Sequence, residues 1–232
     1  MKQIAETIAY KGMRKAVGKR MEISGAYPMS YQGIYVDVTD LLAFRKKVNA
    51  EKNARLTVND YIIKAASISL QRVPIMNSAF TEDMKEIQVY SSCNISVMTA
   101  SEKGLVAPVL KDTQDKTIFQ LSDEMKVLID KANQGKLMPD DYADGTFGIT
   151  NIGKLNSFDS VPLPQPPQPA IMTACTAKKM PVVLDDGKDT IAVRMMMKLV
   201  IGGDHRILDG VPLAQFINSM KELLENPSQL VQ

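Results

Sequence analysis

The chain has 232 residues, of which 45% are hydrophobic and 23% are charged, and its formal net charge is +2. These values describe an ordinary globular protein with a core large enough for one large domain, and they exclude a disordered or fibrous chain. The small net charge argues against a nucleic-acid-binding protein, although a modest basic bias is compatible with a phosphorylated cofactor.

Two further absences narrow the class of protein. Residues 1–10 lack the apolar stretch of a secretion signal, and no apolar run in the chain reaches the roughly 20 residues of a membrane span. Cys93 and Cys175 are isolated, without a Cys-x-x-Cys pair or metal-ligand spacing. We therefore expect a soluble intracellular protein with reduced thiols, no metal site, and neither a membrane nor a nucleic-acid partner.

The first half of the chain alternates helical and extended patterns. Apolar residues four apart predict a short helix with a basic surface over residues 10–25, and residues 31–38 read as a strand. Thr39 is a candidate N-cap for a helix to about residue 53. Thr57 is a candidate cap for a second helix to about residue 73, whose wide apolar stripe predicts burial before Pro74 ends it.

The second half predicts mainly strands. Residues 86–90, 94–99 and 105–110 read as strands, with a hairpin turn at 100–104. Thr117 and Gln120 form a capping box for a long helix that ends at Gly135. Further strands are expected at 146–151, 170–184 and 190–201, with a rigid proline-rich loop at 162–169, a turn at 185–189 and a final helix at about 211–224. The predicted class is α+β around a mixed sheet, in a single domain spanning residues 1–232.

His205 is the only histidine in the chain. It follows a hydrophobic run that reads as a buried strand, and Gly202-Gly203 is expected to end that strand where the backbone bends or another group comes close. Among side chains, histidine is the best suited to proton transfer near neutral pH. If the protein performs such chemistry, His205 is therefore the candidate.

The segment from Asp204 to Gly210 resembles the His-x-x-x-Asp-Gly signature shared by chloramphenicol acetyltransferases and dihydrolipoamide acyltransferases, and its Asp-His-Arg opening resembles the second family in particular. Further matches occur in the same order as in that family, at residues 12–16, 104–109, 145–153, 166–171 and 223–227. Nearly the whole chain thus resembles the catalytic domain of dihydrolipoamide acyltransferases of 2-oxo acid dehydrogenase complexes.

This resemblance implies a chloramphenicol-acetyltransferase-like two-layer sandwich that assembles as a homotrimer, or as a larger cage of trimers, with active sites between subunits. It implies transfer of an acyl group, with acetyl as the first expectation, between coenzyme A and dihydrolipoamide. The lipoyl group would be carried on a domain not in this chain, since the lipoyl and peripheral subunit-binding domains expected upstream are absent. The implied partners are components of a 2-oxo acid or acetoin dehydrogenase complex, in the bacterial cytoplasm or the mitochondrial matrix.

The resemblance also assigns roles to individual residues. His205 would be the general base and Thr150 the donor to an oxyanion, although Thr150 also suits a strand for its propensity alone. Asp209 would pair with Arg14 to hold the loop in shape, and it could equally cap the following helix. Lys64 could reach a coenzyme A phosphate, but a lysine whose stem lies along apolar surface is the more ordinary explanation.

Two departures from the family pattern stand out. Gly202-Gly203 replaces a serine and a larger residue, and Thr150 replaces a serine whose hydroxyl it can substitute. Two alternatives remain open: a scaffold without catalytic importance, and a coenzyme-A-dependent acetyltransferase of the chloramphenicol type. The latter family typically has His-His where this chain has Asp204 before His205, which argues against it. The acyl group, whether acetyl, succinyl or branched-chain, is not determined by the sequence.

Overall fold

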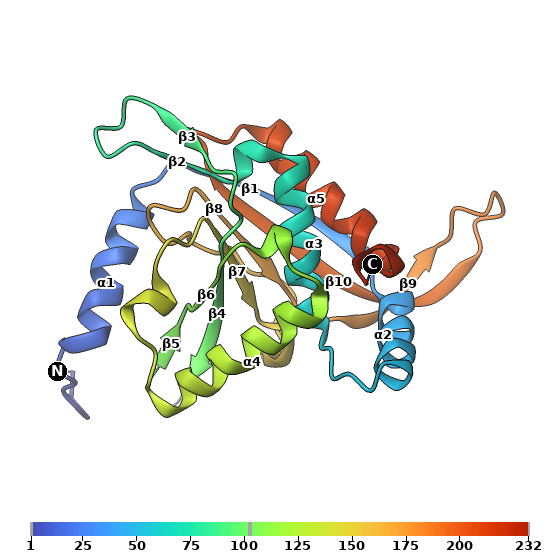
Figure 1. Cartoon of the computed structure of the whole chain (residues 1–232), viewed down its shortest axis with the longest axis horizontal. Coiled ribbons are helices and arrows are strands. Elements are labelled where there is room, and N and C mark those ends of the chain that lie inside the picture. Colours follow the sequence, from blue (N-terminus) through green and yellow to red (C-terminus); the bar gives the residue numbers. More distant parts are fainter. Residues whose placement is uncertain (1, 102–103, 232) are drawn as a thin grey trace.

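The computed structural model of the chain describes residues 2–101 and 104–231, so that Glu102 and Lys103 of the expected hairpin turn lie outside the described residues. Helices and strands are mixed along the chain (Figure 1). The α-helices are α1 (Gly12–Gly25), α2 (Thr39–Glu51), α3 (Val58–Arg72), α4 (Ile118–Gln134) and α5 (Gly210–Glu225). The strands are β1 (Met29–Asp37), β2 (Ser78–Phe80), β3 (Ile87–Val89), β4 (Ile95–Ser101), β5 (Gly104–Val106), β6 (Val109–Leu110), β7 (Phe147–Asn151), β8 (Ala170–Ala174), β9 (Lys178–Val183) and β10 (Ile191–Asp204).

The main sheet is mixed, as the sequence predicts. Its strands follow the order β1-β10-β8-β7-β4-β5, with β6 paired to β4 and β9 paired to β10. The pairs β4–β7 and β7–β8 are parallel, and the other pairs are antiparallel. The β9–β10 hairpin projects from the body of the molecule, whereas β2 and β3 form a separate two-stranded ribbon (Figure 1).

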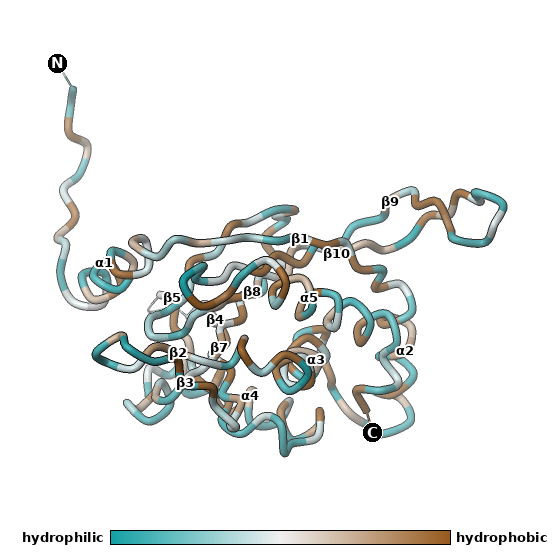
Figure 2. Tube along the Cα trace, turned by 90° about the horizontal axis from the view of Figure 1, so that it is seen from above, coloured by the Kyte–Doolittle hydropathy of each residue, from teal (hydrophilic) through white to brown (hydrophobic). Residues whose placement is uncertain are grey.

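Helices α3, α4 and α5 pack on one face of the sheet and enclose the core with it (Figure 2). Phe147 and Ile149 of β7 point into this core, and Phe147 lies 5.0 Å from Phe216 of α5 between ring centroids. Because side chains alternate along a strand, Gly148 and Thr150 belong to the opposite face. The sheet is therefore one layer and the helices are the second.

On the opposite face of the sheet, the segment between β7 and β8, which contains the proline-rich loop, contacts β4. Gln165 donates to Sδ of Met98 on β4 at 3.5 Å, and Gln168 donates to Oγ of Ser96 at 2.6 Å. Ser24, near the end of α1, donates to the carbonyl of Pro164 at 2.7 Å. The loop thus ties the end of α1 to the sheet.

Two of the three predicted N-cap residues are correct. Thr57 forms a capping box with Asp60, and Thr117 forms one with Gln120. Thr39 is different, because the N-cap position of α2 falls on Val38. The hydroxyl of Thr39 instead accepts a hydrogen bond from the backbone N–H of Met195, at 2.8 Å. Local residue spacing cannot predict a contact with a strand 156 residues away.

The long strand expected at 170–184 is divided in two by a β-bulge. Between the pairs Leu199–Ala174 and Met196–Lys178, β10 has two residues and the opposing chain has three. The extra residue bends the chain, and the side chain of Thr176 turns to the carbonyls of Ile152 and Gly153. The strand expected at 105–110 is likewise divided, at Pro108, which has no N–H to donate to a ladder.

Strand β10 continues through Gly202 and Gly203 to Asp204, so the expectation that it ends at the glycines is wrong. The last helix, α5, begins at Gly210 and buries one apolar face, and a following 3-10 turn places Leu230 fully inside the core. Among residues 2–101 and 104–231, no helix combines the length and apolar character that crossing a membrane requires.

Candidate functional site

His205 lies on a tight turn between the end of β10 and the start of α5. The turn is fixed at both sides by backbone hydrogen bonds from distant parts of the chain. Asp204 donates its N–H to the carbonyl of Pro169, and His205 donates to the carbonyl of Pro28, each at 2.8 Å. The N–H groups of Ile207 and Leu208 then return to the carbonyl of Asp204 at 2.9 and 2.8 Å. The backbone of the turn is therefore held in place although the histidine side chain is 52% exposed.

The residues on either side of His205 are joined by an ion pair. The carboxylate of Asp204, whose side chain is 2% exposed, accepts three hydrogen bonds of 2.6 to 3.1 Å from the guanidinium of Arg206. It also accepts one from the backbone N–H of Arg206 at 3.1 Å. The hydrogen bonds to Asp204 raise the pKa of Arg206, and burial raises the pKa of nearby Tyr27, with Asp204 adding to the effect. Arg206 is therefore a permanent cation and Tyr27 a neutral phenol.

Asp209 is close enough to His205 to influence its ring. Its Oδ1 lies 3.5 Å from Nδ1 of His205, and its side chain is 82% exposed. Asp209 occupies the N-cap position of α5, but its side chain makes no capping hydrogen bond. An aspartate beside Nδ1 favours the tautomer with the proton on that atom, which leaves Nε2 free to accept a proton.

The glycine pair before the turn provides space for close packing on both faces of β10. A Cβ atom at Gly202 would lie 2.6 Å from the ring of Tyr31, and one at Gly203 would lie 2.8 Å from Leu213 and 2.9 Å from Leu208. The second half of the expectation for these glycines, that another group comes close, is thus confirmed. Gly203 allows the turn to pack directly on α5.

Thr150 occupies a different part of the sheet. It is half-buried on β7, on the face opposite the helices, and it pairs with Met98 on one side and Thr173 on the other. Thr173 is fully buried, and its hydroxyl has no hydrogen-bond partner in the described part of the chain.

The sheet register separates Thr150 from His205. Thr150 lies opposite Thr173, which lies opposite Val200, and His205 is five residues beyond Val200. Five residues of strand span about 17 Å, and two strand spacings add about 10 Å across the sheet, so the separation is on the order of 20 Å. The two residues therefore cannot act on the same atom within one chain.

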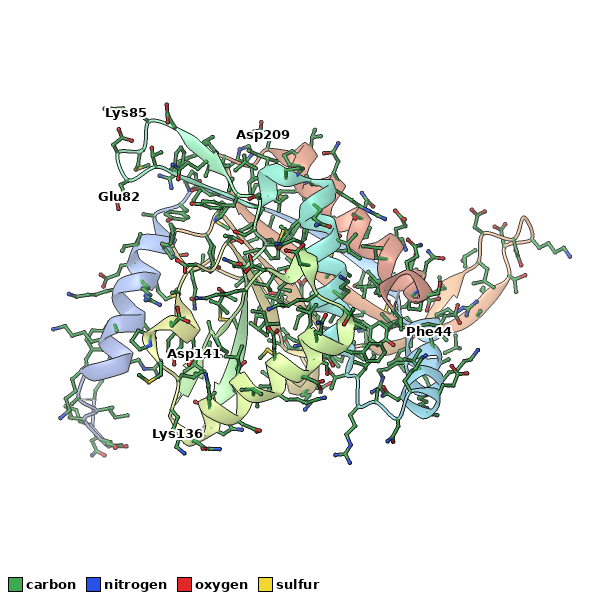
Figure 3. All side chains as sticks on the ribbon, viewed as in Figure 1. Phe44, Glu82, Lys85, Lys136, Asp141 and Asp209 are labelled. Atoms are coloured by element: carbon green, nitrogen blue, oxygen red, sulfur yellow. The ribbon has the colours of Figure 1, made fainter. Side chains whose placement is uncertain are left out.

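The remaining sequence candidates do not join these residues in one chain. Arg14 is exposed on α1, and among the described residues it forms no ion pair with Asp209. Figure 3 shows Asp209 well away from α1. The amino group of Lys64 donates to the carbonyl of Lys116 at 2.6 Å, and burial lowers its pKa while Asp115 opposes the shift. Lys64 thus links α3 to the segment before α4, and its expected contact with coenzyme A stays a prediction.

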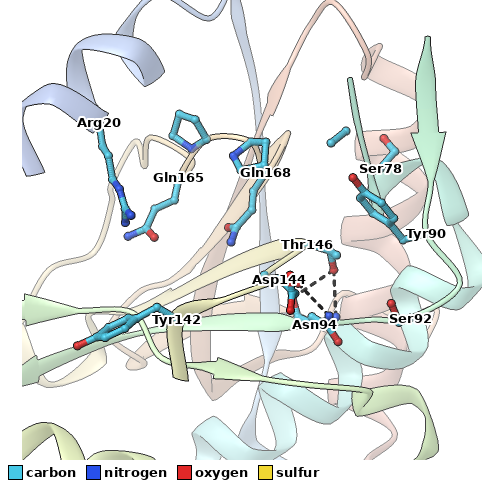
Figure 4. A pocket seen from close by; sticks show the side chains of 14 residues that line it. Arg20, Ser78, Tyr90, Ser92, Asn94, Tyr142, Asp144, Thr146, Gln165 and Gln168 are labelled. Carbon is cyan, nitrogen blue, oxygen red and sulfur yellow. Dashed lines mark hydrogen bonds between the residues drawn. The ribbon is translucent and has the colours of Figure 1, made fainter. Parts of the chain in front are cut away.

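A pocket with a volume of about 400 Å³ is lined by neither His205 nor Thr150 (Figure 4). It lies between the end of α1, the loop at 165–168, the β2–β3 ribbon and the residues before β7. Arg20, Tyr142 and Gln168 face it. The catalytic candidates are thus outside this pocket.

Several further residues hold the histidine turn. Tyr27 and Phe80 stack on the guanidinium of Arg206 at 4.7 and 5.4 Å from the ring centroids. The carbonyl of Pro28 and the side chain of Gln32, which donates to the carbonyl of Gly210 at 2.7 Å, complete the support. None belongs to the histidine motif, and no local pattern marks them.

Comparison with known sequences places the chain in a family. Residues 2–232 match the family model described as 2-oxoacid dehydrogenases acyltransferase (catalytic domain). The chain is 36% identical over 220 residues to the dihydrolipoyllysine-residue acetyltransferase component of the pyruvate dehydrogenase complex of Rickettsia conorii, covering 93% of this chain and 52% of the relative. It is 35% identical over 224 residues to the lipoamide acyltransferase component of the branched-chain alpha-keto acid dehydrogenase complex of Bacillus subtilis, with 94% and 52% covered. The chain thus spans about half the length of these curated relatives.

Solved structures share the same fold. Dihydrolipoamide acetyltransferase of Azotobacter vinelandii, solved to investigate a serine, a histidine and an asparagine in its catalytic mechanism, aligns with a TM-score of 0.91 at 26% identity, covering 99% of this chain and 95% of that one. In that protein the histidine precedes the asparagine by four positions, the spacing of His205 and Asp209. The cubic core of the pyruvate dehydrogenase multienzyme complex aligns equally well, with a TM-score of 0.91 at 25% identity and coverage of 99% and 95%.

Chloramphenicol acetyltransferase aligns with a TM-score of 0.57 at 15% identity, covering 89% of this chain and 94% of that one. This likeness supports the expected fold and nothing about activity. The family model matches from residue 2 to residue 232, and the two relatives are 36% and 35% identical to the chain. The chain therefore belongs to the 2-oxoacid dehydrogenase acyltransferase family, and it corresponds to the catalytic domain.

Proposed function

We propose that this domain transfers an acyl group, with acetyl as the first expectation, between coenzyme A and dihydrolipoamide, at a site formed where two copies of the chain meet. The observation that carries the proposal is the exposed imidazole of His205 on a turn fixed by the carbonyls of Pro28 and Pro169. A base that must meet two different thiols in succession needs both exposure and a fixed backbone.

The chemistry follows from the properties of thiols. A free thiol with a pKa of about 8.5 is mostly protonated at pH 7, so the attacking thiol must lose its proton. Nε2 of His205 takes that proton, the sulfur attacks the thioester carbonyl, and a tetrahedral oxyanion forms. The bond from carbon to the original sulfur then breaks, and the imidazolium returns the proton to the departing thiolate. Such acid–base assistance contributes about 10²- to 10⁴-fold to the rate.

Thr150 of the partner subunit is our candidate donor to the oxyanion. One aimed donor of this kind contributes roughly 3 to 4 kcal/mol in the transition state. The separation on the order of 20 Å within one chain means that, if both residues act at one site, they belong to different copies. The same reasoning applies to Arg14 and Asp209, which do not meet within the described part of one chain.

Exposed apolar side chains support assembly of several copies as a homotrimer. Val183, Ile191 and Val193 of the projecting β9–β10 hairpin are 59%, 70% and 67% exposed, and they would be covered if the hairpin lay against a neighbouring copy. The likeness to a solved cubic core supports larger cages built from such trimers.

The expected partners follow from the same relatives. The acyl donor or acceptor would be a lipoyl group on a separate domain, which a 2-oxo acid dehydrogenase component loads. Named relatives include bacterial proteins and a mitochondrial one from Arabidopsis thaliana, which supports a location in the bacterial cytoplasm or the mitochondrial matrix.

The proposal is tested by mixing the protein with acetyl-coenzyme A and either dihydrolipoamide or chloramphenicol, and following release of the coenzyme A thiol. We expect turnover with the dithiol only, and a loss of about 10²- to 10⁴-fold in kcat for His205→Ala. Isobutyryl-coenzyme A should be compared in parallel, because one relative belongs to a branched-chain complex. Normal turnover by His205→Ala, or transfer to chloramphenicol alone, would refute the proposal.

A further inference from the structure

We propose that Asp204 and Arg206 act as a positioning pair for His205, so that the two neighbours of the histidine in the sequence fix the direction in which its ring leaves the turn. This inference rests on the proposed function, in which His205 is the base. It adds two residues that act on the reaction only through the histidine.

The ring of His205 has little support of its own. Its one ionic neighbour in the described part of the chain is Asp209 at 3.5 Å, and that carboxylate is itself 82% exposed. The orientation of the ring must therefore come from the backbone that carries it. The backbone is constrained at Asp204 and at Arg206, on the two sides of His205.

The pair is built to be rigid. Asp204 is almost completely buried, and a buried carboxylate without a partner is strongly unfavourable. Arg206 satisfies both of its oxygens through Nε and Nη2, in the fork-like geometry that only arginine offers. Because the chain must reach back from residue 206 to residue 204 to make these bonds, the residue between them is forced outward.

Aromatic rings hold the guanidinium from outside the turn. Arg206 lies 4.7 Å from the ring centroid of Tyr27, just before β1, and 5.4 Å from that of Phe80 on β2. Guanidinium groups stack favourably on such rings. The turn is therefore anchored to the start of β1 and to the β2–β3 ribbon as well as to the sheet.

The pair also sets the charge around the histidine. The charged or titratable groups in contact at the turn include Asp204, Arg206, Asp209 and Tyr27. Tyr27 is neutral, and the charges of Asp204 and Arg206 compensate each other. Asp204→Asn would leave the Arg206 cation uncompensated beside His205, which disfavours a positive charge on the imidazole.

The test compares Asp204→Asn, Arg206→Met and Arg206→Lys with the wild-type full chain. We expect kcat to fall about 10- to 100-fold in the first two variants with KM changed less than about threefold, because a displacement of about 1 Å can cost 10²-fold. Lysine keeps the charge but loses the fork, so Arg206→Lys should fall between the wild type and Arg206→Met. The double variant Asp204→Asn/Arg206→Met should lose about as much as either single variant, because each already breaks the pair.

A second measurement separates positioning from general loosening of the fold. The single histidine gives one set of imidazole signals in NMR, and their titration midpoint should move to lower pH in Asp204→Asn, with the acid limb of kcat/KM following it. Arg72→Met is the matched control, since it removes an arginine ion pair with Glu222 elsewhere on the surface, and it should leave kcat and the midpoint unchanged.

The proposal is overturned if the pair variants keep kcat within about twofold of the wild type. It is also overturned if their losses multiply in the double variant, or if the midpoint stays fixed in Asp204→Asn. A wild-type protein without transfer activity would refute the proposed function instead, while the NMR titration would still test the pair.

Discussion

The histidine turn and the Thr150 strand place their functional groups in opposite ways. His205 is 52% exposed and depends on contacts from Pro28, Pro169 and the Asp204–Arg206 pair, all made around a short connection. Thr150 is half-buried on β7, which pairs in parallel with β4 on one side and β8 on the other. The register of these strands fixes its position. The candidate base is thus held by a few specific contacts, whereas the candidate oxyanion donor is held by the sheet as a whole.

The largest expected difference between the two regions concerns catalysis at Thr150. Removing one oxyanion donor costs about 10²- to 10³-fold in kcat, so we expect this loss for Thr150→Ala with little change in the melting temperature. Thr150→Ser keeps the hydroxyl and should retain kcat within a few-fold. Steady-state kinetics with both substrates would measure this, and an equal loss in the two variants would show that strand packing, and not the hydroxyl, matters at this position.

The histidine turn should be the more sensitive region to small changes in packing. Gly203→Ala introduces a Cβ within 2.9 Å of Leu208 and Leu213, and we expect it to lower the free energy of unfolding by about 1–3 kcal/mol and to reduce kcat. Gly25→Ala is the control, because a Cβ there meets nothing within 4 Å. Urea unfolding of both variants would check the difference, and equal stabilities would contradict the close packing of the turn on α5.

The smallest expected effect concerns the thiols near the strand region. Cys175 follows β8 two residues after Thr173, and burial raises its pKa; burial also raises the pKa of Cys93, to about 11. Raised values keep both thiols protonated, so labelling of the folded protein by a disulfide reagent should stay slow from pH 7 to pH 9. The unfolded chain is the control and should react at both cysteines. Fast labelling of folded Cys175 would mean that the strand region holds a nucleophile.

Local patterns predicted most of the elements and the histidine motif. Thr57, Thr117 and Gly135 mark helix ends through interactions within one helical turn. Local sequence patterns therefore predict these three positions correctly. The prediction of Thr39 as an N-cap is wrong because its hydroxyl accepts a hydrogen bond from Met195 of β10, far along the chain. The bulge before β9 and the three-residue strand β2 were missed for a related reason, since neither leaves a periodic signal.

The site shows the same division. His205, Asp209 and Thr150 stand out in the sequence as a single histidine and as parts of motifs. Tyr27, Phe80 and the carbonyl of Pro28 do not, because their roles arise only when β1, β2 and β10 come together. The sequence also could not predict the separation of His205 from Thr150, because that separation depends on strand order and register.

The most direct test of a site shared between copies is complementation of two inactive variants. His205→Ala and Thr150→Ala would each be purified alone as references, and the two chains would also be co-expressed so that mixed assemblies can be purified and assayed. With random mixing in a cyclic homotrimer, about a quarter of the interfaces would unite an intact His205 with an intact Thr150 of the partner subunit. We predict recovery of about a quarter of wild-type activity on that basis. Activity no higher than that of the separate variants, in assemblies shown to contain both chains, would contradict the account.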